Sequence, residues 1–118
     1  MAAPNIANLT SILGKTSGLA ITTTPTAIVT NTAASGKVYK LNALYVSNIA
    51  TDNNYAVTVE VLKGGATAYS IAYQIPVPVG ASLDVLSRIV YLEEGDSLQL
   101  TADLNSTLQA VCSYEVMS

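Results

Sequence analysis

The segment Tyr55-Ala-Val-Thr-Val-Glu-Val61, followed by Lys63-Gly-Gly-Ala66, decides the fold class of this chain. Every second residue of the first segment is apolar or aromatic, and Thr58 and Glu60 lie between them, which is the period of two that is typical of a β-strand. The adjacent glycines allow the positive φ that a tight hairpin needs. Because the alternation resumes in residues 69–75, we predict two antiparallel strands joined by a hairpin turn.

The same period of two recurs along the rest of the chain. It predicts strands in residues 83–92, 98–101 and 108–116. The earlier run 37–49 is also predicted to be extended, but it has apolar residues on both faces, which indicates a bulge or burial on two sides. Pro76 and Pro78 cannot donate to a central ladder, so their segment is expected at a sheet edge or at a crossing between sheets. We therefore predict an all-β fold, an antiparallel β-sandwich of about eight strands, jelly-roll or immunoglobulin-like.

The composition favours a domain that associates with other subunits. The chain has 118 residues, which suits one domain, and half of them are apolar while 11% are charged, with a formal net charge of −3. The surface of a small soluble monomer usually carries roughly 25–35% charged residues. A domain with so few charges often hides much of its surface against neighbours.

Several classes of partner find no support in the sequence. The scattered Lys15, Lys37, Lys40, Lys63 and Arg88 form no basic stripe, so we expect no nucleic-acid binding. No uninterrupted apolar run of roughly 18 residues is present, so we expect no membrane span. The first five residues lack a basic region and a long apolar core, so we expect no signal peptide.

The chemical repertoire is narrow. Histidine is absent, which removes the usual general base, the usual zinc ligand and every triad that needs an imidazole. Cys112 is the only cysteine, so no intramolecular disulfide and no CxxC metal pair can form, and it is most simply a small core residue. Lys63-Gly-Gly lacks the spacing of a phosphate-binding loop. We therefore expect no catalytic residues, no metal and no cofactor.

The first twenty residues differ from the rest, and we predict an N-terminal arm over 1–20 that precedes a sandwich domain over 21–118. Ile6, Leu9 and Leu13 fit one stripe of a short helix, with Asn5 as its cap and Gly14 as its stop. The segment equally suits an extended arm. In either form its apolar side chains need a surface to cover, either the sheet of their own chain or a neighbouring subunit. The side chains expected to contact a subunit or shell are Ile6, Leu9, Ile12 and Leu13.

The stretch Tyr91-Leu-Glu-Glu-Gly-Asp-Ser-Leu-Gln-Leu100 places three carboxylates around one glycine. A calcium loop needs more oxygen ligands at fixed offsets. A glycosidase pair needs two carboxylates in a cleft, whereas neighbouring strand residues such as Glu93 and Glu94 point to opposite sides. We interpret the stretch as a water-facing turn in which Asp96 and Ser97 accept hydrogen bonds from backbone amides.

The order of the strand and turn patterns resembles a group of small virion structural proteins of tailed bacteriophages. The resemblance covers nearly the whole chain. It is carried by Met1 to Thr24, with Ile12-Leu-Gly-Lys-Thr16, then by Ser35-Gly-Lys-Val-Tyr-Lys-Leu41, Ile75-Pro-Val-Pro-Val-Gly80, Val90-Tyr-Leu-Glu-Glu-Gly-Asp-Ser-Leu98 and Ser113-Tyr-Glu-Val-Met-Ser118. It implies a β-sandwich subunit present in many copies on the virion, assembled in the host cytoplasm. It implies no catalytic residues.

Two locations on the particle fit this resemblance. One is decoration of the head lattice, often as trimers, with the major capsid protein as partner; the other is a ring in the neck or tail. A hypothesis of another class is a carbohydrate-binding module that uses exposed tyrosines such as Tyr91 or Tyr39. The tyrosines 55, 69 and 73 lie on apolar strand faces, so we expect them in the core or in a subunit contact.

Overall fold

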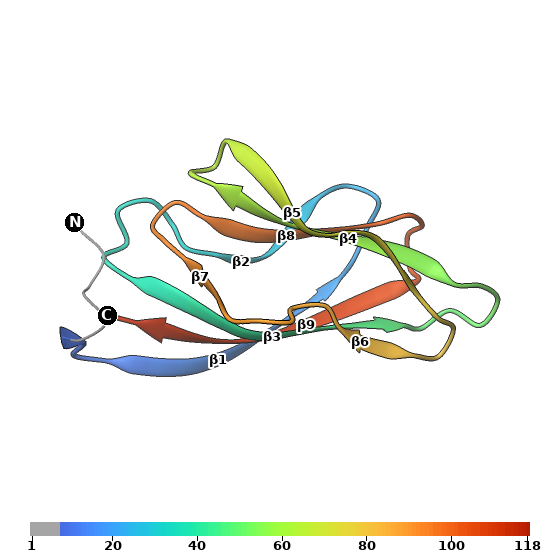
Figure 1. Ribbon diagram of the computed structural model, residues 1–118, viewed down its shortest axis with the longest axis horizontal. Coiled ribbons are helices and arrows are strands. Elements are labelled where there is room, and N and C mark those ends of the chain that lie inside the picture. The colour runs from blue at the N-terminus through green and yellow to red at the C-terminus, as the bar shows by residue number, and fades with distance from the viewer. Residues whose placement is uncertain (1–7) are drawn as a thin grey trace.

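The computed structural model describes residues 8–118, and the regular elements within Ile12–Met117 are all β-strands. Nine strands form two sheets that lie face to face (Figure 1). All strand pairs are antiparallel, which confirms the predicted all-β sandwich. The strands are β1 (Ile12–Ala20), β2 (Thr26–Thr30), β3 (Val38–Asn48), β4 (Tyr55–Lys63), β5 (Thr67–Val77), β6 (Ser82–Asp84), β7 (Val90–Leu92), β8 (Ser97–Ala102) and β9 (Leu108–Met117).

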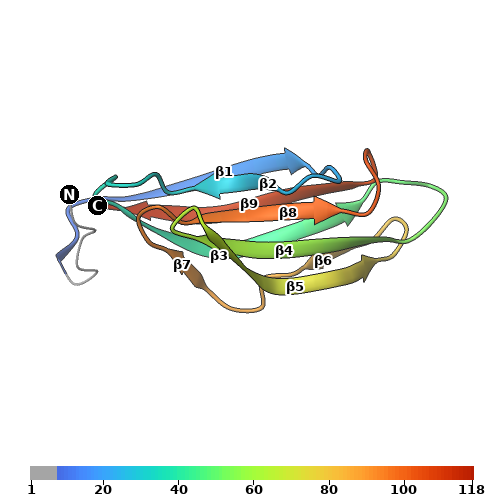
Figure 2. The ribbon, with the colours of Figure 1, turned by 90° about the horizontal axis from the view of Figure 1, so that it is seen from above.

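The chain crosses repeatedly between the two sheets. Sheet A has the order β1-β9-β3-β6, and β7 pairs with β3 beside β6; sheet B has the order β2-β8-β4-β5. Among the described strands, only β4 and β5 are consecutive in sequence and also paired. Strands β1 and β2 lie in different sheets, unlike the first two strands of an immunoglobulin domain. Viewed from above, β1 and β2 form one edge of the sandwich and β5 and β6 the opposite edge (Figure 2).

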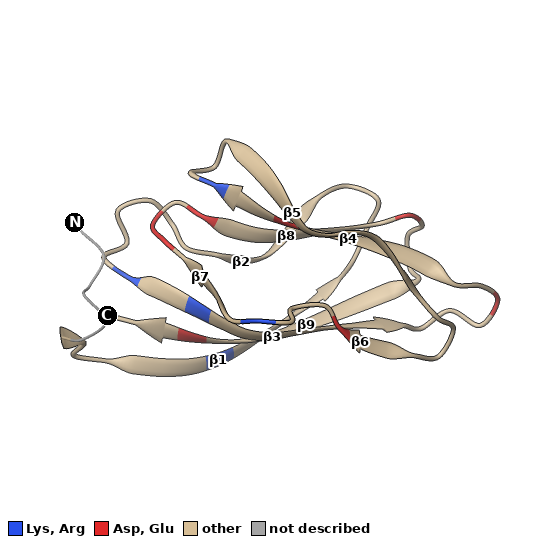
Figure 3. Ribbon diagram, viewed as in Figure 1, with Lys and Arg blue, Asp and Glu red and all other residues tan. Residues whose placement is uncertain are grey.

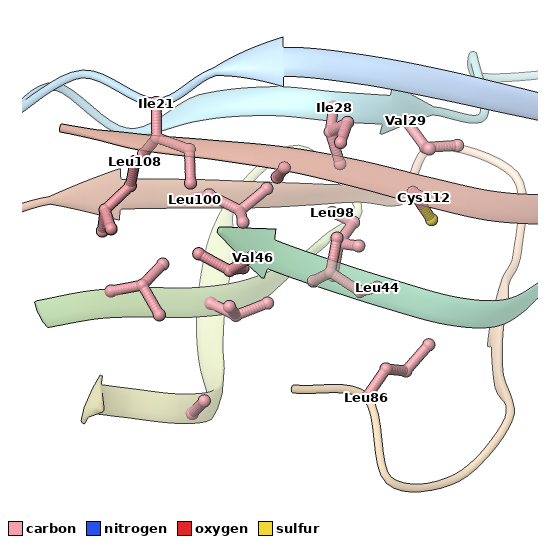
Figure 4. Packing of buried hydrophobic residues seen from close by; sticks show 14 of the residues in the cluster. Ile21, Ile28, Val29, Leu44, Val46, Leu86, Leu98, Leu100, Leu108 and Cys112 are labelled. Carbon is pink, nitrogen blue, oxygen red and sulfur yellow. The ribbon is translucent and has the colours of Figure 1, made fainter. Parts of the chain in front are cut away.

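The core fills the space between the sheets with branched aliphatic side chains. Leu41, Leu44 and Val46 of β3 are buried on the two sides of the strand bulge. Leu98 and Leu100 of β8 meet Leu44 and Val46 from sheet B (Figure 4). The Cys112 side chain lies among these residues, as predicted. The period of two in the sequence thus corresponds to one face of each strand being covered by the opposite sheet.

The backbone conformations at the hairpin and at the β3 bulge agree with the predictions from sequence. Gly64 and Gly65 both have positive φ, and the amide of Ala66 donates to the carbonyl of Lys63 at 3.0 Å, which confirms the predicted hairpin. The register of β3 against β9 shifts between Leu41 and Ala43, so the predicted bulge is present.

Strand β5, which contains Pro76, lies at the edge of sheet B, and Pro78 follows it in the crossing to sheet A, as predicted for this segment. Its register against β4 shifts twice, between Val57 and Val59 and between Val59 and Glu60. Gln74 adopts φ 49°, a conformation that suits the bulge. Tyr69 and Tyr73 are 61% and 67% exposed because the opposite sheet extends little beyond this edge, so neither tyrosine belongs to the core.

The N-terminal segment joins the sheet of its own chain over part of its length. Strand β1 pairs with β9 in an unbroken antiparallel register from Ile12 opposite Met117 to Ala20 opposite Gln109. Residues 12–20 of the predicted arm are therefore extended, not helical, and lie at the edge of sheet A. Residues 1–7 of that arm lie outside the described residues. No helix in the described part of the chain is long and apolar enough to cross a membrane.

Candidate functional site

The acidic turn between β7 and β8 packs against the hairpin between β4 and β5. The turn closes through the amide of Asp96, which donates to the carbonyl of Glu93 at 3.0 Å, and Gly95 has φ 88°. A Cβ added to Gly95 would lie 3.7 Å from the Cα of Gly64, so the two turns abut. The lysine at the end of β4 is seen beside the acidic loop in Figure 3.

Asp96 is the centre of this contact. Asp96 is 2% exposed, and its carboxylate accepts three hydrogen bonds. Oδ2 accepts from Lys63 Nζ at 2.6 Å and from the amide of Glu93 at 3.0 Å, while Oδ1 accepts from the amide of Gly64 at 3.0 Å. A buried carboxylate with three donors, one of them charged, holds two turns in one geometry.

The two glutamates bind different partners. Glu93 Oε2 accepts from Lys63 Nζ at 2.8 Å, and its side chain stays largely in water. Glu94 Oε2 accepts from the amide of Gly36 at 2.8 Å, in the loop before β3. The prediction of a water-facing turn is therefore wrong for Asp96, which is buried because the hairpin and Lys63 cover it. The prediction that Asp96 accepts backbone amide bonds is confirmed.

The protonation of this cluster follows from its contacts. Burial alone would raise the pKa of Asp96, but the hydrogen bonds from Lys63, Gly64 and Glu93 outweigh it and hold the pKa below its ordinary value. The hydrogen bonds to Asp96 and Glu93 raise the pKa of Lys63, although burial opposes the shift. Both groups are therefore charged at neutral pH.

The contacts among Lys63, Glu93 and Asp96, here called the clasp, hold two turns together. This geometry suits a structural role better than cation binding or proton transfer. The ammonium of Lys63 already occupies the position between Glu93 and Asp96 that a metal ion would take. No group of three or more potential metal ligands is found among residues 8–118. The arrangement instead ties β4, β5, β7 and β8 together at one end of the sandwich.

Two buried asparagines, which the sequence analysis did not single out, secure the loops at the two ends. Asn31 Nδ2 donates to the carbonyls of Lys37 and Leu92 at 2.9 and 3.0 Å. Asn48 Nδ2 donates to the carbonyls of Asn53 and Val77 at 3.0 and 2.9 Å. Asparagine beside a strand end is also common in plain turns, so sequence patterns carry no distinctive signal for this role.

The tyrosines proposed for glycan binding differ in position. The Tyr39 ring stacks on that of Tyr114 with centroids 5.7 Å apart and packs against the core, so it is only partly exposed. Tyr91 is exposed on β7. Tyr39 and Tyr91 therefore do not form one surface on which a sugar could stack.

The predicted contact residues are described only in part. Ile12 and Leu13 are 59% and 53% exposed on β1, and Leu9 is half-buried before that strand. Ile6 lies outside the described residues. As neighbours in one strand, Ile12 and Leu13 point to opposite faces of sheet A, and both are accessible at one end of the β1 edge.

Cys112 offers a direct test of the packing. Burial raises the pKa of its thiol to about 11, so at neutral pH very little thiolate forms. We expect a chromogenic thiol reagent to modify the folded protein at least ~100-fold more slowly than the protein in denaturant. Equal rates in the two conditions would contradict the buried position.

Comparison with known proteins adds little to these observations. No protein-family model and no curated protein matches the chain. Two similar solved structures are both described as a pentameric capsid protein isolated from metagenomic phage sequences, with 17% and 20% identity and a TM-score of 0.36 each. The alignments cover 98% of this chain but 65% and 64% of those chains, so it spans less than two thirds of their length. A TM-score this low does not establish a shared fold.

Proposed function

We propose that this chain is a virion structural protein of a tailed bacteriophage, a decoration or cement subunit that stabilises the head lattice as a homo-oligomer. The proposal starts from the sequence resemblance to small phage virion proteins. The observation that carries it is the surface of the sandwich, which has few charges and exposes many large apolar side chains. Its partners are other copies of itself and the major capsid protein, and its role is to bind without a chemical reaction.

The exposed apolar side chains support a surface that other subunits cover. Among residues 8–118 they include Ile12 and Leu13 on β1, Tyr45 and Val111 on the outer face of sheet A, and several residues of β5. Some of the few charged groups bind one another, in the pair of Lys40 with Glu115 and in the contacts of Lys63 with Glu93 and Asp96. Burial of apolar surface contributes roughly 25 cal/mol per Å² before the costs of association.

The strand order supports the same proposal. Four strands per sheet, with β6 and β7 taken as two halves of one interrupted strand, follow the order of a jelly roll. Jelly rolls are common in viral capsid and lectin domains. Because one fold serves many functions, this argument supports the proposal only together with the surface.

The experiment that tests the proposal is localisation of the protein on intact particles by cryo-electron microscopy. Hundreds of copies on the head would support a decoration protein. A single ring at the neck, or copies that repeat with the tail rings, would replace it with a neck or tail role. Absence of the chain from purified particles would overturn a virion role.

The Ile12–Leu13 pair provides a prediction for particle binding. In the double variant Ile12→Asp/Leu13→Asp, we expect the sandwich to stay folded because both side chains are exposed. We expect occupancy on particles, measured by co-sedimentation, to fall at least ~10-fold if this pair is buried at the contact. The control is Leu104→Asp, which changes an exposed leucine in the loop between β8 and β9. Unchanged occupancy in the double variant would exclude the pair as a contact.

A further inference from the structure

One row of side chains crosses the outer face of sheet A and combines an aromatic ring with charges of both signs. Tyr91 of β7 lies directly opposite Lys40 of β3, and Lys40 lies opposite Glu115 of β9. These side chains point away from the core, because the residues before and after each of them pack into it. Figure 3 shows the lysine position of β3 beside the acidic position of β9. The three residues are here called the outer row.

The outer row brings its functional groups within reach of one small ligand. Neighbouring strands lie about 4.8 Å apart, so the row spans roughly 10 Å from β7 to β9. The Tyr91 side chain is 46% exposed. The ammonium of Lys40 and the carboxylate of Glu115 converge to 3.7 Å. The exposed ring and the charged pair are therefore two adjacent parts of one short surface.

The polar groups of the outer row have unused hydrogen-bonding capacity. The distance of 3.7 Å from Lys40 Nζ to Glu115 Oε1 makes an ion pair but is too long for a hydrogen bond. Glu115 Oε1 accepts one long hydrogen bond, from Asn42 Nδ2 at 3.4 Å. The Lys40 and Glu115 side chains are 30% and 34% exposed. A ligand can therefore accept from the ammonium and donate to the carboxylate at the same time.

These groups limit the chemistry of the ligand. Any charged ligand meets one charge of its own sign at Lys40 or Glu115, which favours a neutral one. An apolar ligand would bury both charges without replacing their hydrogen bonds to water. A peptide strand cannot extend the sheet at this row, because the backbone of β3 is already paired there with β7 and with β9. The ligand is therefore neutral, rich in hydroxyl groups and apolar on one face.

We propose that the outer row binds a neutral pyranose unit of a glycan. The C–H face of the sugar packs on the Tyr91 ring, whose π face attracts the weakly positive hydrogens. Two neighbouring hydroxyls bind the charged pair, one accepting from Lys40 and one donating to Glu115. A site that uses one aromatic ring and a few polar groups in this way fixes the orientation of its ligand. This function is additional to the proposed virion role and does not depend on it.

The first test is binding of the full chain, displayed in many copies on beads, to an array of neutral and sialylated oligosaccharides, since multivalency makes a weak site detectable. The dissociation constant for the neutral oligosaccharide bound best is then measured by titration. We expect Tyr91→Ala to raise this constant at least ~10-fold. The matched control is Tyr45→Ala, because Tyr45 is 48% exposed on the same face but has Val111 as its β9 partner instead of a charged residue. Circular dichroism verifies that both variants fold.

A pair of glycines on β1 provides a second test that leaves the outer row itself intact. Gly14 lies opposite Glu115, and a Cβ added there meets no other atom within 4 Å. Gly14→Thr is therefore expected to fold, since threonine suits a strand, and to place a side chain beside the Glu115 carboxylate. We expect the dissociation constant to rise at least ~5-fold. The matched control is Gly18→Thr, one turn of the pleat pattern further along β1 and opposite Val111, which should leave binding unchanged.

Four results would overturn the proposal. One is a wild-type chain that binds no neutral glycan on the array, and another is a chain that binds only sialylated glycans. The third is equal binding by wild type and Tyr91→Ala, or equal losses in Tyr91→Ala and Tyr45→Ala. The fourth is a Tyr91→Ala variant that loses its place on particles while wild type binds no glycan, which assigns the outer row to a subunit contact. Glycan binding by a chain that is absent from particles refutes the virion role alone.

Discussion

Replacing Asp96 with alanine is expected to lower the free energy of unfolding by about 2–4 kcal/mol, because the change leaves two backbone amides without their acceptor and removes the charge-assisted hydrogen bond from Lys63, whose ammonium is itself partly exposed. For a domain of this size the loss corresponds to a fall in Tm of roughly 10–20 °C. Urea or thermal unfolding measures it. The variant is expected to lose this stability without any change in the apolar core.

The control is Glu93→Gln. Glu93 contacts the same ammonium, but its side chain is largely exposed, so its ion pair is worth about 0–1 kcal/mol. If both substitutions cost the same, Asp96 is not the centre of the clasp. Substitution of Lys63 by methionine should fall between the two, since it leaves Asp96 with its two backbone donors.

The same carboxylate makes stability depend on pH. Its folded-state pKa lies below the unfolded value, so its contribution is complete above roughly pH 4 and is lost as the pH falls through the folded pKa. Unfolding free energies of wild type and Asp96→Asn should therefore differ most above that pH and converge in acid. Parallel curves down to about pH 2 would contradict the assignment.

Leu100→Ala is expected to lower the free energy of unfolding by about 3–4 kcal/mol. Leu100 is fully buried in β8, with Thr26 of β2 and Val59 of β4 as its strand neighbours, so the truncation leaves a cavity that the two sheets cannot collapse to fill. Chemical denaturation with an unchanged m-value would measure it. The control Leu104→Ala, at an exposed leucine, should cost less than about 1 kcal/mol. A loss of less than about 1 kcal/mol at Leu100 would mean that the sheets are not packed as described.

Much of the fold was predictable because strand patterns are local. Alternation in residues 55–61 identified β4 and the side of it that faces the core, and the adjacent Gly64 and Gly65 identified the hairpin. The bulge of β3 could be predicted since apolar residues fall on both of its faces. Strand β2 was missed, because Thr26–Thr30 is short and sits in a threonine-rich segment without clear alternation.

The candidate site was predicted less well. The carboxylates of the acidic turn were identified, but their partners Lys63 and Gly36 are far away along the chain. Whether Asp96 faces water depends on the hairpin that covers it, and a one-dimensional pattern contains no information on that contact. The same holds for Asn31, whose acceptor at Leu92 belongs to another strand.

The sequence by itself determined the all-β class, the hairpin, the edge position of the proline segment and the buried Cys112, since each depends on backbone chemistry or on a period within a few residues. Only the tertiary structure decided that β1 pairs with β9 and that the apolar side of β5 is left uncovered. The alternation of apolar and polar residues indicates that a strand has one apolar face. Which face is covered depends on how far the opposite sheet extends, and at the β5 edge that sheet ends with the short strand β6.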